Sequence, residues 1–199
     1  MSPRPRLGAA IAWIVGPLTY LILEAVAAAA FPHYSYAHNF ISDLGVAASP
    51  REAVMNTAFC LQGTLFLVGA VFLDRARLFL TLAGANALGN VLIAIFHSGV
   101  AAHAVGAVLA IVGGNTAILA GSRIGEPLYR RVSVGLGAIG LLNFVVFILV
   151  LQHVMPAPLG VWERGSVYSI LLWQMFTATW LIARSSRRPN LWRARARRA

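Results

Sequence analysis

Lysine is absent from this chain of 199 residues, acidic side chains number only six, and there is a single cysteine, Cys60. One cysteine cannot form a disulfide within the chain, and its place in an apolar run is typical of a small buried side chain. Charged residues make up 11% of the chain and hydrophobic residues 59%. That is too little charge to cover the surface of a soluble domain, so the composition indicates a protein that lies in lipid.

Apolar segments long enough to span a bilayer recur along the whole chain, with no long polar linker between them. A spanning helix needs roughly 20 mostly apolar residues. Six segments meet that requirement: 8–31, 53–73, 78–96, 103–121, 132–154 and 166–183. We therefore predict an all-α fold, a polytopic membrane helical bundle of six transmembrane helices. It would form one domain, residues 1–183, followed by a basic cytoplasmic tail, residues 184–199.

The positions of the arginines predict the orientation of these helices, because short cytoplasmic loops carry an excess of positive residues. With a cytoplasmic N-terminus, fourteen of the sixteen arginines lie on the cytoplasmic side, and only Arg51 and Arg164 lie on the other. We therefore expect both termini in the cytoplasm (N-in/C-in). The predicted location is the bacterial cytoplasmic membrane, the plasma membrane of the cell, with a multi-pass topology.

The net charge of +10 also raises the question of nucleic-acid binding. The arginines flank apolar segments instead of covering one polar face, so we expect no nucleic-acid partner. Seven of them lie between residues 184 and 198, where they mark the flank of the last helix. The same segment is suited to binding anionic lipid headgroups, and the two interpretations are compatible.

Most of the other ionisable residues gather at or near the predicted outer face. They comprise all five histidines and four acidic residues: His33, His38, His97, His103, His153, Glu24, Asp43, Glu52 and Glu163. Glu24 would lie about 10 Å below the outer end of its helix, at about 1.5 Å per residue. A carboxyl at that depth normally faces a bundle interior or a wet cavity. The distribution predicts an extracytoplasmic polar pocket.

Helical periodicity places Asn86, Asn90 and His97 on one face of the third predicted helix. The fourth helix begins with His103 above a face of small residues. Small residues allow membrane helices to approach closely, and amides can bond across the contact. The pattern fits either two helices joined by asparagine side chains or a polar path between them.

Two polar motifs are expected in the outer loops. The first loop contains Ser42 and Asp43 before Gly45, a combination that forms turns. The second, Glu163-Arg164, is expected just before the sixth helix. Serine, aspartate and histidines on one membrane face would also suit hydrolysis or metal binding, although no known catalytic or zinc-binding spacing is complete.

Two functions remain open at this point. In the first, the pocket binds a lipid or a membrane partner, through the candidate residues Glu24, His38, Asn39, Ser42, Asp43, Asn90, His97, His103, Glu163 and Arg164. In the second, the protein is a membrane-embedded hydrolase acting on an outer-leaflet lipid. Its catalytic candidates are Asp43, Glu24, Glu163, His97 and His103. A metal would be held by His38, His97 and His103, but we predict no metal site, and the sequence names no cofactor.

The run Phe-Ile-Ser-Asp-Leu-Gly-Val at residues 40–46, followed by Asn56 early in the second helix, resembles the domain-of-unknown-function 998 family of small bacterial and archaeal membrane proteins. The stretch 96–107 and Trp162-Glu163-Arg164 ahead of Trp173 are similar to the same pattern. The resemblance covers nearly the whole chain. It implies a six-helix membrane topology and no particular chemistry.

Overall fold

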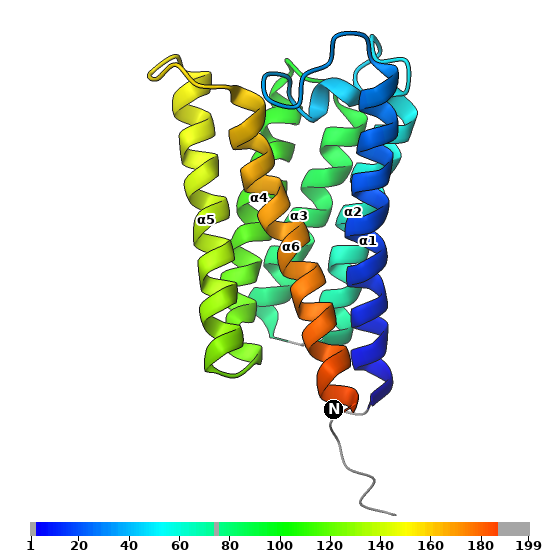
Figure 1. The fold of residues 1–199 in the computed structure, drawn as a ribbon, viewed down its shortest axis with the longest axis vertical. Coiled ribbons are helices and arrows are strands. Elements are labelled where there is room, and N and C mark those ends of the chain that lie inside the picture. Colours follow the sequence, from blue (N-terminus) through cyan, green and yellow to red (C-terminus); the bar gives the residue numbers. More distant parts are fainter. Residues whose placement is uncertain (1–2, 74–75, 187–199) are drawn as a thin grey trace, which may run out of the picture.

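The computed structural model describes residues 3–73 and 76–186 (Figure 1). In these ranges the regular structure is entirely helical, without strands. The elements are α1 (Pro3–Ala30), η1 (Ser42–Gly45), α2 (Glu52–Leu73), α3 (Arg77–Ile95), α4 (Ala101–Gly121), η2 (Ser122–Ile124), α5 (Pro127–Leu151) and α6 (Leu159–Ser186). Six helices are long and apolar enough to cross a membrane, which confirms the predicted all-α, six-helix fold. The predicted basic tail lies outside the described residues from residue 187 onward.

The six long helices form a closed ring in which each helix packs against its neighbours in sequence and α6 returns to α1. The connections α1–α2, α3–α4 and α5–α6 lie together at one end, called the upper end because it is uppermost in Figure 1. All five histidines lie at this end, in those three connections or in the first turn of α4. The chain therefore concentrates its imidazoles at one end of the bundle.

The interior is apolar in two clusters, one above the other. The lower cluster is built around Trp13, Phe66 and Trp173, whose rings contact one another. The indole N–H of Trp13 donates to the carbonyl oxygen of Phe66 at 3.1 Å, and that of Trp173 donates to Ser133 Oγ at 2.9 Å. These bonds satisfy polar groups that would otherwise be unpaired in an apolar interior. The upper cluster contains Tyr20, Leu44 and Phe59.

Helices α3 and α4 approach each other closely at Gly89, where an added Cβ would overlap the backbone of Gly106 and Ala110. Asn86 Nδ2 donates to the carbonyl oxygen of Ala110 across the contact at 2.6 Å. Asn90 Nδ2 instead donates to the carbonyl of Asn86 in its own helix, at 2.9 Å. Small residues and one amide therefore join these helices, as the first of the two sequence interpretations describes.

Helix α6 begins at Leu159 rather than at residue 166, directly after Pro158. Glu163 and Arg164, which we expected in a loop, therefore belong to the helix. That expectation was wrong because we treated charged residues as a sign that the membrane helix had not yet begun. Both side chains in fact have partners inside the bundle. His97 also differs, because α3 ends at Ile95 and this histidine lies in the connection beyond it, exposed.

Candidate functional site

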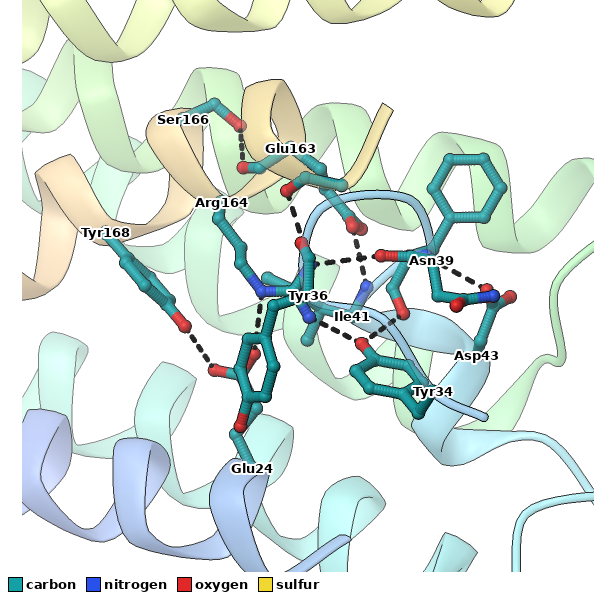
Figure 2. Close-up of polar contacts among 12 residues, drawn as sticks. Glu24, Tyr34, Tyr36, Asn39, Ile41, Asp43, Glu163, Arg164, Ser166 and Tyr168 are labelled. Carbon is teal, nitrogen blue, oxygen red and sulfur yellow. Dashed lines mark hydrogen bonds and ion pairs between the residues drawn. The ribbon is translucent and has the colours of Figure 1, made fainter. Parts of the chain in front are cut away.

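A buried ion pair joins α1 to α6 near the upper end (Figure 2). Arg164 Nε lies 3.1 Å from Glu24 Oε1, and the two side chains are only 7% and 1% exposed. Tyr168, one helical turn after Arg164, donates its hydroxyl to Glu24 Oε2 at 2.9 Å. Residues four apart share one face of a helix, so α6 presents both groups to the same carboxylate.

The rest of the Arg164 guanidinium holds the α1–α2 connection. Its Nη1 donates to the carbonyl oxygens of Tyr36 at 2.7 Å, Asn39 at 3.0 Å and Gly160 at 3.3 Å. Its Nη2 donates to Tyr34 Oη at 2.5 Å. The guanidinium carbon also lies 4.6 Å from the centroid of the Tyr36 ring, within the range of a cation–π contact. One planar fork of donors thus fixes the connection against two helices, which a lysine could not do.

Tyr34 links this network to the next part of the loop, because its hydroxyl donates to the carbonyl oxygen of Phe40 at 2.7 Å. Burial raises the pKa of Tyr34 well above its usual value, and the positive charge of Arg164 only partly opposes that shift. Burial raises the pKa of Tyr36 as well, with a further contribution from the negative charge of Glu24. Both phenols therefore stay protonated at neutral pH.

Two acidic side chains hold the segment that begins η1. Glu163 Oε2 accepts a hydrogen bond from the Ile41 backbone N–H at 2.6 Å, and Asp43 Oδ2 accepts one from Phe40 N–H at 2.9 Å. Asn56 Nδ2 donates to the carbonyl oxygen of Gly45 at 3.0 Å, where any side chain on Gly45 would overlap the Asn56 amide. The Ser-Asp-Leu-Gly run is therefore a 3-10 turn fixed over the top of the bundle.

Beneath η1 lies a small cavity of about 50 Å³, called the chamber. Among its lining groups, Tyr20 Oη, Gln62 Oε1 and Asn86 Oδ1 are buried and have no hydrogen-bond partner within the described residues. Such atoms are costly to leave unpaired, by about 1–3 kcal/mol each. Three of them around one cavity indicate a space suited to a polar guest, water included.

Beside the chamber lies a larger cavity of about 510 Å³, called the groove, lined by α4, α5 and the α3–α4 connection. Its walls include Val108, Phe144, Phe147, Ile148 and Leu151. This volume falls within the range of about 300–1,000 Å³ typical of small-molecule sites. Five residues line both spaces, so the groove and the chamber adjoin: Ser42, His103, Ala107, Ile111 and Glu163.

His103 lies where the two spaces adjoin, and its environment assigns its protons. Its Nδ1 lies 2.8 Å from the carbonyl oxygen of Phe96. A carbonyl only accepts hydrogen bonds, so Nδ1 carries the hydrogen, and in the neutral ring Nε2 carries the lone pair. His103 therefore offers an acceptor to a molecule bound at the junction.

The residues expected at one site divide into three groups. Ser42, Asn90, His103 and Glu163 line the chamber. Glu24, Asn39, Asp43 and Arg164 belong to the network that fixes the loop. His38 and His97 are exposed at the upper end and line neither cavity.

Sequence reasoning missed the tyrosines that complete this region, Tyr20, Tyr34, Tyr36 and Tyr168. Tyr20 and Tyr168 carried a signal, because they stand four residues from Glu24 and Arg164 on their helices. Gln62 of α2 also lines the chamber, and nothing in its local sequence pointed to a cavity. Among the described residues, no group of three or more His, Cys, Asp or Glu is placed to hold a metal ion.

Six helices long and apolar enough to span a bilayer indicate a multi-pass membrane protein. The chain matches, over residues 14–189, the family described as "Protein of unknown function (DUF998)", and it belongs to that family, which confirms the resemblance seen in the sequence. No curated protein and no solved structure matches it.

Proposed function

We propose that this protein binds a single membrane lipid, with the acyl chain in the groove and the polar head at the chamber. The observation that carries the proposal is that a large, mostly apolar space adjoins a small one whose lining residues include unpaired buried polar atoms. Aromatic and aliphatic residues line the groove, whereas the chamber holds the unpaired atoms of Tyr20, Gln62 and Asn86. A lipid has the same sequence of apolar and polar parts. In the proposed N-in/C-in orientation, in a bacterial plasma membrane, the site opens toward the outer leaflet.

Ala107 provides the test, because it lines both spaces and its side chain is small. Ala107→Phe would fill the junction, so purified protein carrying it should retain much less co-purified lipid than wild type, as counted by mass spectrometry of the extract. Val105→Phe is the matched control, because Val105 lies on the same helix, is 55% exposed and lines neither cavity. Equal lipid retention by both variants and wild type would refute the proposal.

A second candidate function, hydrolysis of the bound lipid, is favoured by the position of Ser42, His103 and Glu163 around one space. His103 Nε2 would take the proton of an attacking water, and an ester would yield an acid and an alcohol. Asp43 and Glu24 are not part of this version, because their carboxylates hold the loop backbone and Arg164. Release of free fatty acid by wild type, lost in His103→Gln, would support hydrolysis. If wild type releases no free fatty acid, hydrolysis is excluded and lipid binding remains the proposed function.

A further inference from the structure

We propose that the head of the bound lipid is small, uncharged and hydroxylated, as in a monoacylglycerol, and that phosphate-bearing heads are excluded. This inference rests on the proposed function and concerns the chemistry of the chamber. The polar groups of the chamber are mainly hydrogen-bond acceptors, its lining contains no arginine among the described residues, and it is small.

The acceptors follow from hydrogen bonds already made. Asn86 Nδ2 donates to the Ala110 carbonyl at 2.6 Å, which fixes the amide orientation and leaves Oδ1 as the unpaired atom. Asn90 uses its Nδ2 on the Asn86 carbonyl in the same way. His103 uses Nδ1 on the Phe96 carbonyl and keeps an acceptor at Nε2. With the donors of these three residues engaged, the Tyr20 hydroxyl is the unpaired buried donor among the described lining residues, and it can accept as well. A guest hydroxyl both donates and accepts, so it suits this set.

A phosphate finds no arginine counter-charge in the described lining of the chamber. Within the described part of the chain, neither the chamber nor the groove has an arginine in its lining. The nearby Arg164 already directs Nε, Nη1 and Nη2 to Glu24, to three backbone carbonyls and to Tyr34. A phosphate in the chamber would lie beside the carboxyl of Glu163 without a counter-charge, which is strongly unfavourable in a buried site.

The size of the chamber agrees with a small head. A cavity needs roughly 10–15 Å³ to hold one water-sized group. The chamber, at about 50 Å³, therefore has room for about three to five such groups. A glycerol unit is of that size, whereas a sugar ring or a phosphocholine is larger.

The test compares two lipids that differ only in phosphate: a monoacylglycerol and the phosphate monoester of the same molecule, lysophosphatidic acid. Binding to delipidated wild-type protein in detergent would be measured by quenching of the intrinsic tryptophan fluorescence or by native mass spectrometry. We expect the monoacylglycerol to bind at least about tenfold more tightly, because it buries no charge. Equal or tighter binding of the phosphate ester would overturn the head-group inference while lipid binding itself survives. Binding of neither lipid would remove the proposed function as well.

A pair of variants tests the acceptor directly. Asn86→Leu removes the unpaired Oδ1 and should weaken monoacylglycerol binding severalfold while lowering the preference over the phosphate ester. Asn143→Leu makes the same change on α5. Among the described residues, the hydrogen bond of the Asn143 side chain goes to its own helix, at the Ile139 carbonyl, and Asn143 lines neither cavity. An unchanged preference in a folded Asn86→Leu protein would contradict the role of this residue. The comparison of the two lipids on wild type needs no variant and decides the inference if Asn86→Leu does not fold.

Discussion

Removing Arg164 should destabilise the fold more than removing any exposed arginine. Arg164→Met keeps much of the side-chain length but deletes the charge that faces Glu24 at 3.1 Å. It also leaves the carbonyls of Tyr36 and Asn39 without their donor. Breaking a buried pair by removing one partner costs about 3–5 kcal/mol, because the other charge stays buried without compensation. That is a large part of a typical stability of about 5–15 kcal/mol.

Thermal unfolding in detergent, followed by tryptophan fluorescence, measures this loss. About 2–4 °C of Tm corresponds to 1 kcal/mol in a chain of this size, so Tm should fall on the order of 10 °C. Arg123→Met is the matched control. Arg123 is exposed in η2, and its replacement should change stability by no more than about 0.5 kcal/mol.

The direction in which a second substitution, Glu24→Gln, shifts Tm tests the pairing of Glu24 with Arg164 directly. Glu24→Gln alone should destabilise the protein by about 1–3 kcal/mol, because it removes the partner of a buried guanidinium. In the Arg164→Met background the same substitution should raise Tm, because it neutralises a carboxylate that has lost its counter-charge. An equal decrease in both backgrounds would show that the two side chains act independently, and the account of the pair would be wrong.

Three other predictions follow from the structure. Gly89→Ala should lower stability by about 1–3 kcal/mol, because the new methyl group overlaps the backbone of α4. The control Gly84→Ala meets nothing within 4 Å and should be neutral or stabilising by up to about 1 kcal/mol. Thermal unfolding distinguishes the two variants, and equal effects would contradict the close contact between α3 and α4. The pKa of Tyr34 is raised in the folded protein, so as pH rises the tyrosine loses its proton in the unfolded chain first. Stability should therefore fall as pH rises above about 10. Tm measured from pH 8 to 12 tests this, and Tm should fall less steeply in a Tyr34→Phe variant. In a background without the native cysteine, an impermeant maleimide should label Ala47→Cys in intact cells and Arg123→Cys only after permeabilisation; the opposite pattern would reverse the proposed orientation.

The fold was predictable because each membrane helix is encoded by a long, continuous run of apolar residues. A run of about 20 apolar residues requires only a count, since lipid obliges the backbone to satisfy its own hydrogen bonds. The helix ends were less predictable where charges lie inside a helix. Residues 159–165 contain a glutamate and an arginine, so hydropathy alone excluded them from the sixth span, yet α6 begins at Leu159. The sequence alone does not reveal that Glu163 and Arg164 have partners elsewhere in the folded chain.

The candidate site was predicted as a set of residue types rather than as a geometry. Glu24 was singled out by its depth in the helix, but its partner Arg164 is 140 positions away and only the folded chain brings them together. His97 was placed on a helical face by counting 100° per residue past the point where α3 ends. Asn86 was placed on a polar helical face, yet its contact with the same cavity as Gln62 depends on how α2, α3 and α4 pack.

The loop network and the chamber are parts of one arrangement, and this constrains how a ligand enters. Ile41 and Ser42 line the chamber from above, and Glu163 holds the backbone N–H of Ile41. The preceding loop is held by several donors of Arg164. Opening the chamber from the aqueous side would break these bonds together and expose a buried ion pair, at a cost of several kcal/mol. Separating α4 and α5 at the groove would break mainly apolar contacts, and lipid chains are as apolar as the side chains they would replace. A ligand of this site is therefore expected to arrive sideways from the bilayer, as a lipid does.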